Sequence, residues 1–496
     1  MKRCRIIGSN TLVGPEWSWR YSAFMRNVFP AIACSLGLLL TTPNLTCQVQ
    51  DVDRYVRTEM KYEQIPGVAV GVLIHGKLVQ EIGYGQSDVQ LKTPVNEKTV
   101  FNSGSLAKQF VASAIMLLVQ DGKLNLRDSV TQYLQDAPAS WKAVKIENLL
   151  SHTSGLGDYS TTELTAPGAP FDFTQNISEE ELRKRLYTLP PAFKPGSDWA
   201  YCNTNYVLLG MVIEKVTGRS WGTFLSERIF KPLHMMSART TDIHATVPNR
   251  TLGYVMRQGS LQRERQTAQI WNSTADGSLY LNVDDLAKWD DALLTGKLLR
   301  RTTVEQMWTV FPLNDGKPNP SGYGFGFFIR SVNGHSLIDH EGIWQGFHDY
   351  SAIYPEDGVA VAVLTNLAYP MSRPQDIGKV VAGIYEPALR PAAILPIPDS
   401  NPARTARLRH ILEAVIAGKA SQTDFTPEMW KGIGNNVQVR DWLKAQGAIS
   451  TFQLVDENSA KDRTALRYRA RTAERIFTFT FVLNKEGKVA EMSLSS

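Results

Sequence analysis

Cysteine is scarce in this 496-residue chain, and most of it lies near the amino terminus. Cys4, Cys34 and Cys47 fall within the first 47 residues, which leaves Cys202 alone in the rest of the chain. A single cysteine cannot form an internal disulfide, so we expect none after loss of the leading segment. The histidines are scattered, and no Cys/His group has the spacing of metal ligands. We therefore expect no metal site and no other cofactor.

An excess of charge is also missing from most of the chain. The formal net charge is +5, but residues 1–47 hold five basic residues against a single acidic one, Glu16. The remainder is therefore close to +1. Binding to nucleic acid depends on a concentrated positive field, so this distribution excludes nucleic acid as the expected partner. A small molecule or a peptide is the expected substrate.

Long apolar runs are rare as well, and the stretch at 28–40 is too short to span a membrane comfortably. It follows the basic residues and has the length of a signal-peptide core. We expect residues 1–47 to be a signal peptide or N-terminal anchor, with cleavage near Cys47. The protein is then periplasmic or secreted, with no stable membrane span after processing. A protein anchored by the N-terminal segment, or lipidated at Cys47, is the alternative.

The hydrophobic periodicity predicts an α+β fold. Residues 67–74 and 78–84 read as a strand hairpin, and strands return at 325–330, 337–340, 350–354 and 359–364. Helical patterns lie between them at 105–122, 204–216, 220–229 and 284–289. Strands at both ends of the segment predict one mainly antiparallel sheet flanked by helices, with a helical domain inserted.

A change of composition divides the chain at residues 387–402, which contain five prolines and read as a stiff linker. Beyond it, helical patterns at 408–416 and from 427 precede strand patterns at 449–455, 466–471, 476–483 and 489–494. We expect a small α+β accessory domain over 403–496. Association of the protein with itself through this domain is one role it is expected to allow.

The most informative motif is the pair Ser105 and Lys108, which opens the apolar run 110–119. Residues i and i+3 lie on one helix face, so hydroxyl and amine are expected side by side. The helix dipole and burial both lower the pKa of such an amine. A partly neutral lysine can take the serine proton and turn the hydroxyl into a nucleophile. The motif alone also fits an ordinary capped helix.

Two further motifs follow in the chain. Tyr201-Cys202-Asn203 opens a buried helix, and His340-Glu341-Gly342 ends a strand. In this order and at these separations the three motifs resemble the serine β-lactamase and penicillin-binding-protein superfamily. Within it, the class C branch with its D,D-peptidase, D-aminopeptidase and esterase relatives is most similar. The resemblance covers roughly 52–386, and stretches 150–156, 231–235, 285–289 and 322–326 also match it.

The resemblance implies a role for each residue in a β-lactamase/transpeptidase-like fold. Ser105 is acylated and then freed by hydrolysis, with Lys108 as base. Tyr201 shuttles a proton to the leaving group, and nearby cations are expected to lower its pKa. Asn203 binds the acyl-side carbonyl of the substrate and orients Lys108. The backbone amides of Ser105 and Ile343 form the oxyanion hole, and Gly342 lets the substrate lie against the strand edge.

The third motif departs from the β-lactamase form, in which lysine and threonine precede the glycine. His340 is cationic only when protonated, and Glu341 puts a negative charge where a hydroxyl would stand. If Glu341 faces the site it repels a substrate carboxylate, although strand alternation can turn it away. We therefore expect a peptidase or esterase-like hydrolase rather than a dedicated β-lactamase, which is the alternative. A non-hydrolytic penicillin-binding or sensor protein is the second alternative.

Two other segments bear on the site. Residues 157–195 form a long insertion that carries Tyr159 and Phe173, and they read either as a rim over the substrate or as a surface loop. Residues 218–222 match the G-x-S-x-G pattern of another hydrolase class, which requires a strand before the serine. A helix precedes here, so Ser220 is expected to be a helix cap.

Overall fold

The computed structural model describes residues 43–495, apart from 241–245, 258–259, 266, 369–370, 392–395, 436, 461 and 473–475. Most of the expected leading segment, 1–47, therefore lies outside the described residues. Within the described ranges, no helix has the length and apolar character needed to cross a membrane.

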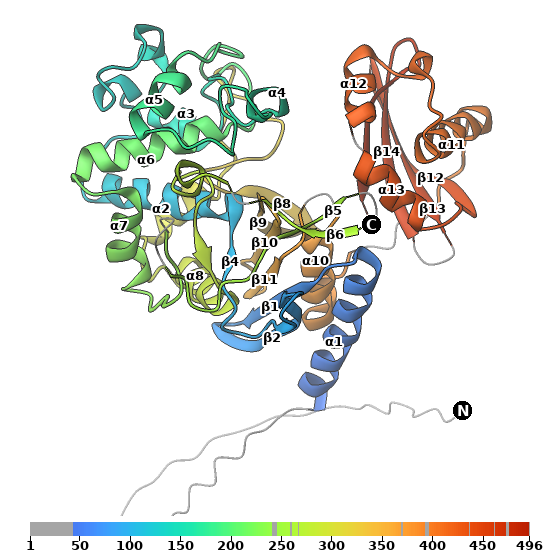
Figure 1. Ribbon diagram of the computed structural model, residues 1–496, viewed down its shortest axis with the longest axis horizontal. Coiled ribbons are helices and arrows are strands. Elements are labelled where there is room, and N and C mark those ends of the chain that lie inside the picture. Colours follow the sequence, from blue (N-terminus) through green and yellow to red (C-terminus); the bar gives the residue numbers. More distant parts are fainter. Residues whose placement is uncertain are drawn as a thin grey trace, which may run out of the picture.

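A seven-stranded antiparallel sheet organises the main part of the chain (Figure 1). Its strand order is β3-β2-β1-β11-β10-β9-β8. The amino-terminal strand β1 pairs with β11, with Val68 opposite Thr365, so the two ends of the segment meet in the middle of the sheet. The strands are β1 (Gly67–Ile74), β2 (Lys77–Asp88), β3 (Thr93–Pro94), β8 (Phe328–Val332), β9 (His335–Trp344), β10 (Phe347–Tyr354) and β11 (Val359–Thr365).

Alternation along β1 explains why its sequence is almost continuously apolar. Val68, Val70 and Val72 pack into one core, on the side of α1 (Pro43–Glu63) and α10 (Pro374–Tyr385). Ala69 and Leu73 belong to the other core, which contains α2 (Ala107–Gln120) and α8 (Val283–Thr295). Because side chains alternate between faces, a strand covered on both sides must be apolar at nearly every position.

The helices between the strands gather on the α2 and α8 side of the sheet (Figure 1). α2 lies in their centre, and its side chains from Ala107 to Leu118 are buried, as expected of a helix that is apolar all round. The other helices here are α3 (Ile146–Leu150), α4 (Thr162–Thr165), α5 (Glu179–Tyr187), α6 (Asn203–Thr217), α7 (Trp221–Leu225) and α9 (Arg301–Met307). Short strands β4 (Phe101–Asn102) and β7 (Tyr280–Leu281) pair, as do β5 (Tyr254–Arg257) and β6 (Ser260–Arg263).

The carboxy-terminal part forms a separate four-stranded antiparallel sheet with three helices (Figure 1). The sheet is β12 (Thr451–Ala460), β13 (Arg463–Arg471), β14 (Ile476–Asn484) and β15 (Val489–Ser495), and the helices are α11 (Pro402–Ile416), α12 (Pro427–Asn435) and α13 (Val437–Ala445). It contacts the main sheet's outer layer, where Arg373 Nη1 donates to the Leu494 carbonyl at 3.1 Å. The predicted α+β class is thus confirmed.

Several elements differ from the sequence prediction. α1 and α10 were not expected, and they cover the outer face of the sheet. The strand expected from 325 begins at Phe328, because 322–327 form a turn in which Gly322 and Gly326 have φ of 65° and 82°. The helix expected from Ser105 begins instead at Ala107, after a 3₁₀ turn at Gly104–Leu106.

Candidate active site

The predicted nucleophile lies in the 3₁₀ turn Gly104–Leu106, and this turn packs directly on β9. Gly104 has φ of 50°, and a Cβ there would lie 2.7 Å from the Ile343 backbone nitrogen. A Cβ on Gly342 would lie 2.0 Å from the Ser103 carbonyl oxygen. Both glycines therefore allow backbone to meet backbone. Gly342 makes room for the nucleophile turn, and its role in letting substrate lie against the strand edge stays a prediction.

The same contact bears on the two predicted oxyanion donors. Gly104 immediately precedes Ser105, and its Cα lies against the Ile343 peptide. The backbone N–H groups of Ser105 and Ile343 therefore belong to adjoining parts of the chain, brought together across a sequence separation of more than two hundred residues. Their role as an oxyanion hole stays a prediction.

Lys108 lies at the centre of the site and is fully buried. Its Nζ lies 3.0 Å from Ser105 Oγ, 2.8 Å from Asn203 Oδ1 and 2.6 Å from the Asp276 carbonyl oxygen. Burial lowers the pKa of Lys108 to about 8, although the Asp276 and Asp158 carboxylates oppose the fall. An amine with this pKa is partly neutral near pH 8, and its lone pair then has the Ser105 hydroxyl within reach.

Tyr201 lies beside this pair, with its ring centroid 5.0 Å from Lys108 Nζ. Burial raises the pKa of Tyr201 well above its ordinary value, and hydrogen bonding to Ser105 only partly offsets this. The expectation of a lowered pKa is therefore wrong, because desolvation of the phenolate outweighs the neighbouring cation. Tyr201 remains a neutral phenol at ordinary pH, and a phenol can donate a proton.

Asn203 is the first residue of α6, and both parts of its amide are engaged. Oδ1 accepts from Lys108, and Nδ2 donates to Ser160 Oγ at 2.8 Å. The Asn203 backbone N–H donates to Asp158 Oδ1 at 3.0 Å. The Lys108 contact is the orientation predicted from the sequence. One N–H of the Asn203 amide remains to meet a substrate carbonyl.

His340 lines a cavity together with Ser105 and Tyr201, but it carries no positive charge there. Its Nδ1 donates to the Glu341 carbonyl at 2.6 Å, since a carbonyl can only accept. Nε2 therefore accepts from the Tyr323 hydroxyl at 3.1 Å. Burial lowers the pKa of His340 to about 3, and the positive charge of Lys108 adds to the fall. His340 is therefore neutral at neutral pH and does not supply the positive charge that a protonated histidine would give.

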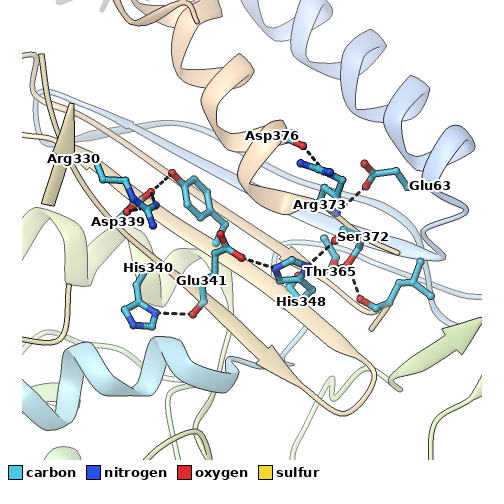
Figure 2. Close-up of polar contacts among 12 residues, drawn as sticks. Glu63, Arg330, Asp339, His340, Glu341, His348, Thr365, Ser372, Arg373 and Asp376 are labelled. Atoms are coloured by element: carbon cyan, nitrogen blue, oxygen red, sulfur yellow. Dashed lines mark hydrogen bonds and ion pairs between the residues drawn. The ribbon is translucent and has the colours of Figure 1, made fainter. Parts of the chain in front are cut away.

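Glu341 points to the opposite face of β9 from His340 (Figure 2). Its Oε2 lies 3.1 Å from Nε2 of His348, a fully buried residue whose Nδ1 donates to the Ser372 carbonyl at 2.7 Å. Burial opposes ionisation of Glu341, but the hydrogen bond and charge of His348 prevail and lower its pKa. The Glu341 carboxylate is therefore ionised at neutral pH and is held toward His348, on the other face of β9 from His340.

Most of the predicted residues line one cavity of about 720 Å³. Ser105, Tyr201, Asn203, His340 and Ile343 line it, and Glu341 adds to the lining although its carboxylate is held toward His348. The insertion 157–195 contributes Tyr159, Ser160 and Phe173, and the Phe173 ring contacts that of Trp344, with centroids 5.7 Å apart. Phe328 and Arg330 also line the cavity, and the Arg330 guanidinium donates to the Asp339 carboxylate at 2.7 and 2.9 Å. The insertion thus forms part of the wall.

Two contributing residues, Asp276 and Tyr323, were not predicted from the sequence. The Asp276 backbone carbonyl accepts a hydrogen bond from Lys108. Every residue has such a carbonyl, so the sequence does not indicate this contact. The Asp276 side chain accepts from the Tyr159 hydroxyl at 2.7 Å, while its Oδ1 is buried with no hydrogen-bond partner among the described residues. Tyr323 orients His340, and it lies in the stretch 322–326 that matches the family. Ser220, by contrast, caps α7 by accepting from the Thr223 N–H, as predicted.

Comparison with known proteins identifies the family of this chain. A family model described as Beta-lactamase matches residues 52–384. The chain belongs to the β-lactamase family. Protein flp of Staphylococcus aureus (strain COL) is 26% identical over 325 residues, which are 64% of this chain and 63% of that protein. The match therefore spans less than two thirds of that relative's length.

Solved structures share the fold of this β-lactamase-family chain. The octameric penicillin-binding protein homologue from Pyrococcus abyssi superimposes with a TM-score of 0.59 at 22% identity, over 90% of this chain and 98% of that one. The D-amino acid amidase from Ochrobactrum anthropi SV3 gives 0.56 at 24% identity, over 70% of this chain and 97% of that one. At these identities the likeness concerns the fold alone.

Proposed function

We propose that this β-lactamase-family protein is a periplasmic or secreted serine hydrolase that cleaves amide, peptide or ester bonds through an acyl-enzyme on Ser105. The observation that carries the proposal is the buried Lys108 amine, held 3.0 Å from Ser105 Oγ with a pKa of about 8. Burial of a lysine is costly, and a lysine held against a serine by two further acceptors is suited to proton transfer.

In the proposed reaction, neutral Lys108 takes the Ser105 proton as Oγ bonds to the substrate carbonyl carbon. The developing oxyanion faces the Ser105 and Ile343 amides. Tyr201, which holds its proton at neutral pH, gives it to the departing nitrogen or oxygen as that bond breaks. The Lys108 ammonium returns a proton to the Tyr201 phenolate, which restores both groups. Water then attacks the acyl carbon as neutral Lys108 takes its proton, and this proton passes to Ser105 Oγ as the acyl bond breaks. Tyr201 thus acts as acid in acylation rather than as a phenolate base.

The third motif supports a peptidase, amidase or esterase over a dedicated β-lactamase. Both ring nitrogens of His340 are engaged within the protein, and its low pKa keeps it neutral. The motif therefore offers no cation to a β-lactam carboxylate. Arg330 is nearby, but Asp339 balances its charge. The alternatives remain a class C-like β-lactamase and a non-hydrolytic penicillin-binding or sensor protein.

A labelling experiment and a substrate panel test the proposal together. A fluorophosphonate should label the mature protein at Ser105, and Ser105→Ala should abolish labelling. Ser220→Ala is the matched control, since it removes the serine of the G-x-S-x-G stretch and should leave labelling intact. The panel compares D-amino-acid amides, D-alanyl dipeptides, nitrophenyl esters and a chromogenic cephalosporin.

Each outcome of that experiment selects a reading. Turnover of amides or esters with slow cephalosporin hydrolysis supports the proposal. Cephalosporin turnover that exceeds all other rates identifies a β-lactamase, and labelling without turnover identifies a binding or sensor protein. Absence of labelling would refute the acyl-enzyme.

Localisation and assembly are further parts of the proposal. The basic segment and apolar stretch within 1–47 support export, with retention by an uncleaved anchor as the alternative. We propose self-association through 403–496, and the octameric state of the Pyrococcus abyssi homologue supports it. Fractionation of cells and light scattering of the purified mature protein measure the two properties directly.

A further inference from the structure

A second, smaller hollow adjoins the candidate active site. It measures about 120 Å³, which is room for several waters. Glu264, Trp344 and Gln345 line both this hollow and the 720 Å³ cavity, so the two adjoin at these residues. Nothing in the proposed acylation chemistry uses the smaller hollow.

The smaller hollow is rich in positive charge. Arg250, Arg263 and Arg265 line it, and among the described residues no carboxylate forms an ion pair with any of the three. The Arg250 guanidinium lies 4.8 Å from the centroid of the buried Tyr280 ring, which holds it at the hollow. We call these three arginines and the hollow they line the basic pocket.

The one acid in its lining does not cancel this charge. Glu264 Oε1 accepts from Arg257 Nη2 at 2.7 Å and from the Arg265 backbone N–H at 2.8 Å. Its charge is thus balanced by Arg257, which lies outside the basic pocket. The remaining polar lining is neutral: Asn102, Thr251, Thr267, Gln269, Asn272, Tyr280 and Gln345. Several guanidinium groups around a small polar hollow suit a carboxylate or phosphate.

The position of the basic pocket indicates which part of a substrate reaches it. Tyr201, the proposed proton donor to the leaving group, has its ring 6.1 Å from that of His340, near Phe328. The leaving group therefore lies toward this end of the cavity. β9 runs from His340 past Ile343 to Trp344, so the far end of the cavity holds the acyl portion. Trp344 lines both spaces, so the basic pocket adjoins the cavity at this far end.

We propose that the basic pocket binds an anionic group at the far end of the acyl portion of the substrate. The substrate class is then an amide or ester of an acyl chain that ends in a carboxylate or phosphate, such as a half-amide or half-ester of a dicarboxylic acid. This inference rests on the proposed function, because it assigns specificity to the same acyl-transfer site.

The test uses 4-nitrophenyl monoesters of dicarboxylic acids from succinate to suberate, each paired with its neutral methyl diester analogue. For every enzyme variant the measured quantity is the ratio of kcat/KM for the anionic ester to that for its neutral partner. We expect a ratio of about ten or more at the best chain length in low salt, which falls as salt rises. In Arg250→Gln/Arg263→Gln/Arg265→Gln the ratio should fall toward one.

Controls separate this inference from the proposed function. Arg127→Gln removes an exposed arginine elsewhere and should keep the parental ratio. In Ser105→Ala, calorimetry with adipate and with inorganic phosphate should show anion binding that the triple substitution abolishes. The two affinities show which of the anions the basic pocket prefers. A ratio near one at every chain length, or one that survives the triple substitution, would overturn the inference. If the unsubstituted protein hydrolyses none of the esters, the proposed function is refuted instead.

Discussion

Gly342→Ala probes the packing between β9 and the nucleophile turn. The new Cβ would lie 2.0 Å from the Ser103 carbonyl oxygen, whereas real Cβ contacts stay beyond 3.0 Å. The two backbones must therefore separate by at least about 1 Å, because no side chain can rotate away. A displacement of this size at the nucleophile is expected to reduce kcat by about 100-fold. Overpacking should also cost about 1–3 kcal/mol of stability.

The assay is the rate at which a small fluorophosphonate labels Ser105, together with kcat and KM for a nitrophenyl ester. The probe is too small to need the strand edge, so slower labelling reports the nucleophile turn itself. Gly432→Ala is the control, since this exposed glycine of α12 has no atom within 4 Å of the added Cβ. Labelling at the parental rate with only KM raised would refute the reasoning and support the predicted role of Gly342 in making room for substrate.

Two other substitutions separate roles within the site. Tyr201→Phe should lower kcat/KM for amides by about 10²–10⁴ but affect nitrophenyl esters far less, because nitrophenolate leaves without a proton; equal losses would argue against Tyr201 as the acid. Glu341→Gln should lower the free energy of unfolding by about 1–3 kcal/mol at pH 7. Since the folded pKa of Glu341 is lowered, that difference should shrink as the pH falls below the ordinary glutamate pKa, and chemical denaturation at pH 7 and pH 3.5 measures it.

Much of the fold was predictable because its signals are local. The apolar run of β1 and the buried helix after Lys108 each show their environment in a few consecutive residues. The pair Ser105 and Lys108 was predictable for the same reason, since one helical turn fixes their proximity. Tyr201 and His340 were predicted from the order and separation of the three motifs. No local pattern in the sequence shows that these residues lie near Ser105.

The remaining features depend on which surfaces meet. Strand alternation places His340 and Glu341 on opposite faces, but only the packing of the nucleophile turn against Gly342 decides which face is the site. The pKa of Tyr201 depends on a balance between a nearby cation and loss of water, and burial prevails only once the helices have closed around it. The Asp276 carbonyl was invisible because every residue carries one.

The central claim is that the buried Lys108 amine removes the Ser105 proton, and the pH dependence of Ser105 acylation tests it most directly. Only the neutral amine is a base, so the acylation rate by a neutral fluorophosphonate should rise about tenfold per unit below the Lys108 pKa of about 8 and level off above it. Burial lowers the pKa values of His340 and His152, so titration of these histidines cannot cause this rise in rate toward pH 8. A rate that is constant from pH 6 to pH 9, or that levels off near the ordinary histidine pKa of about 6.5, would contradict the claim.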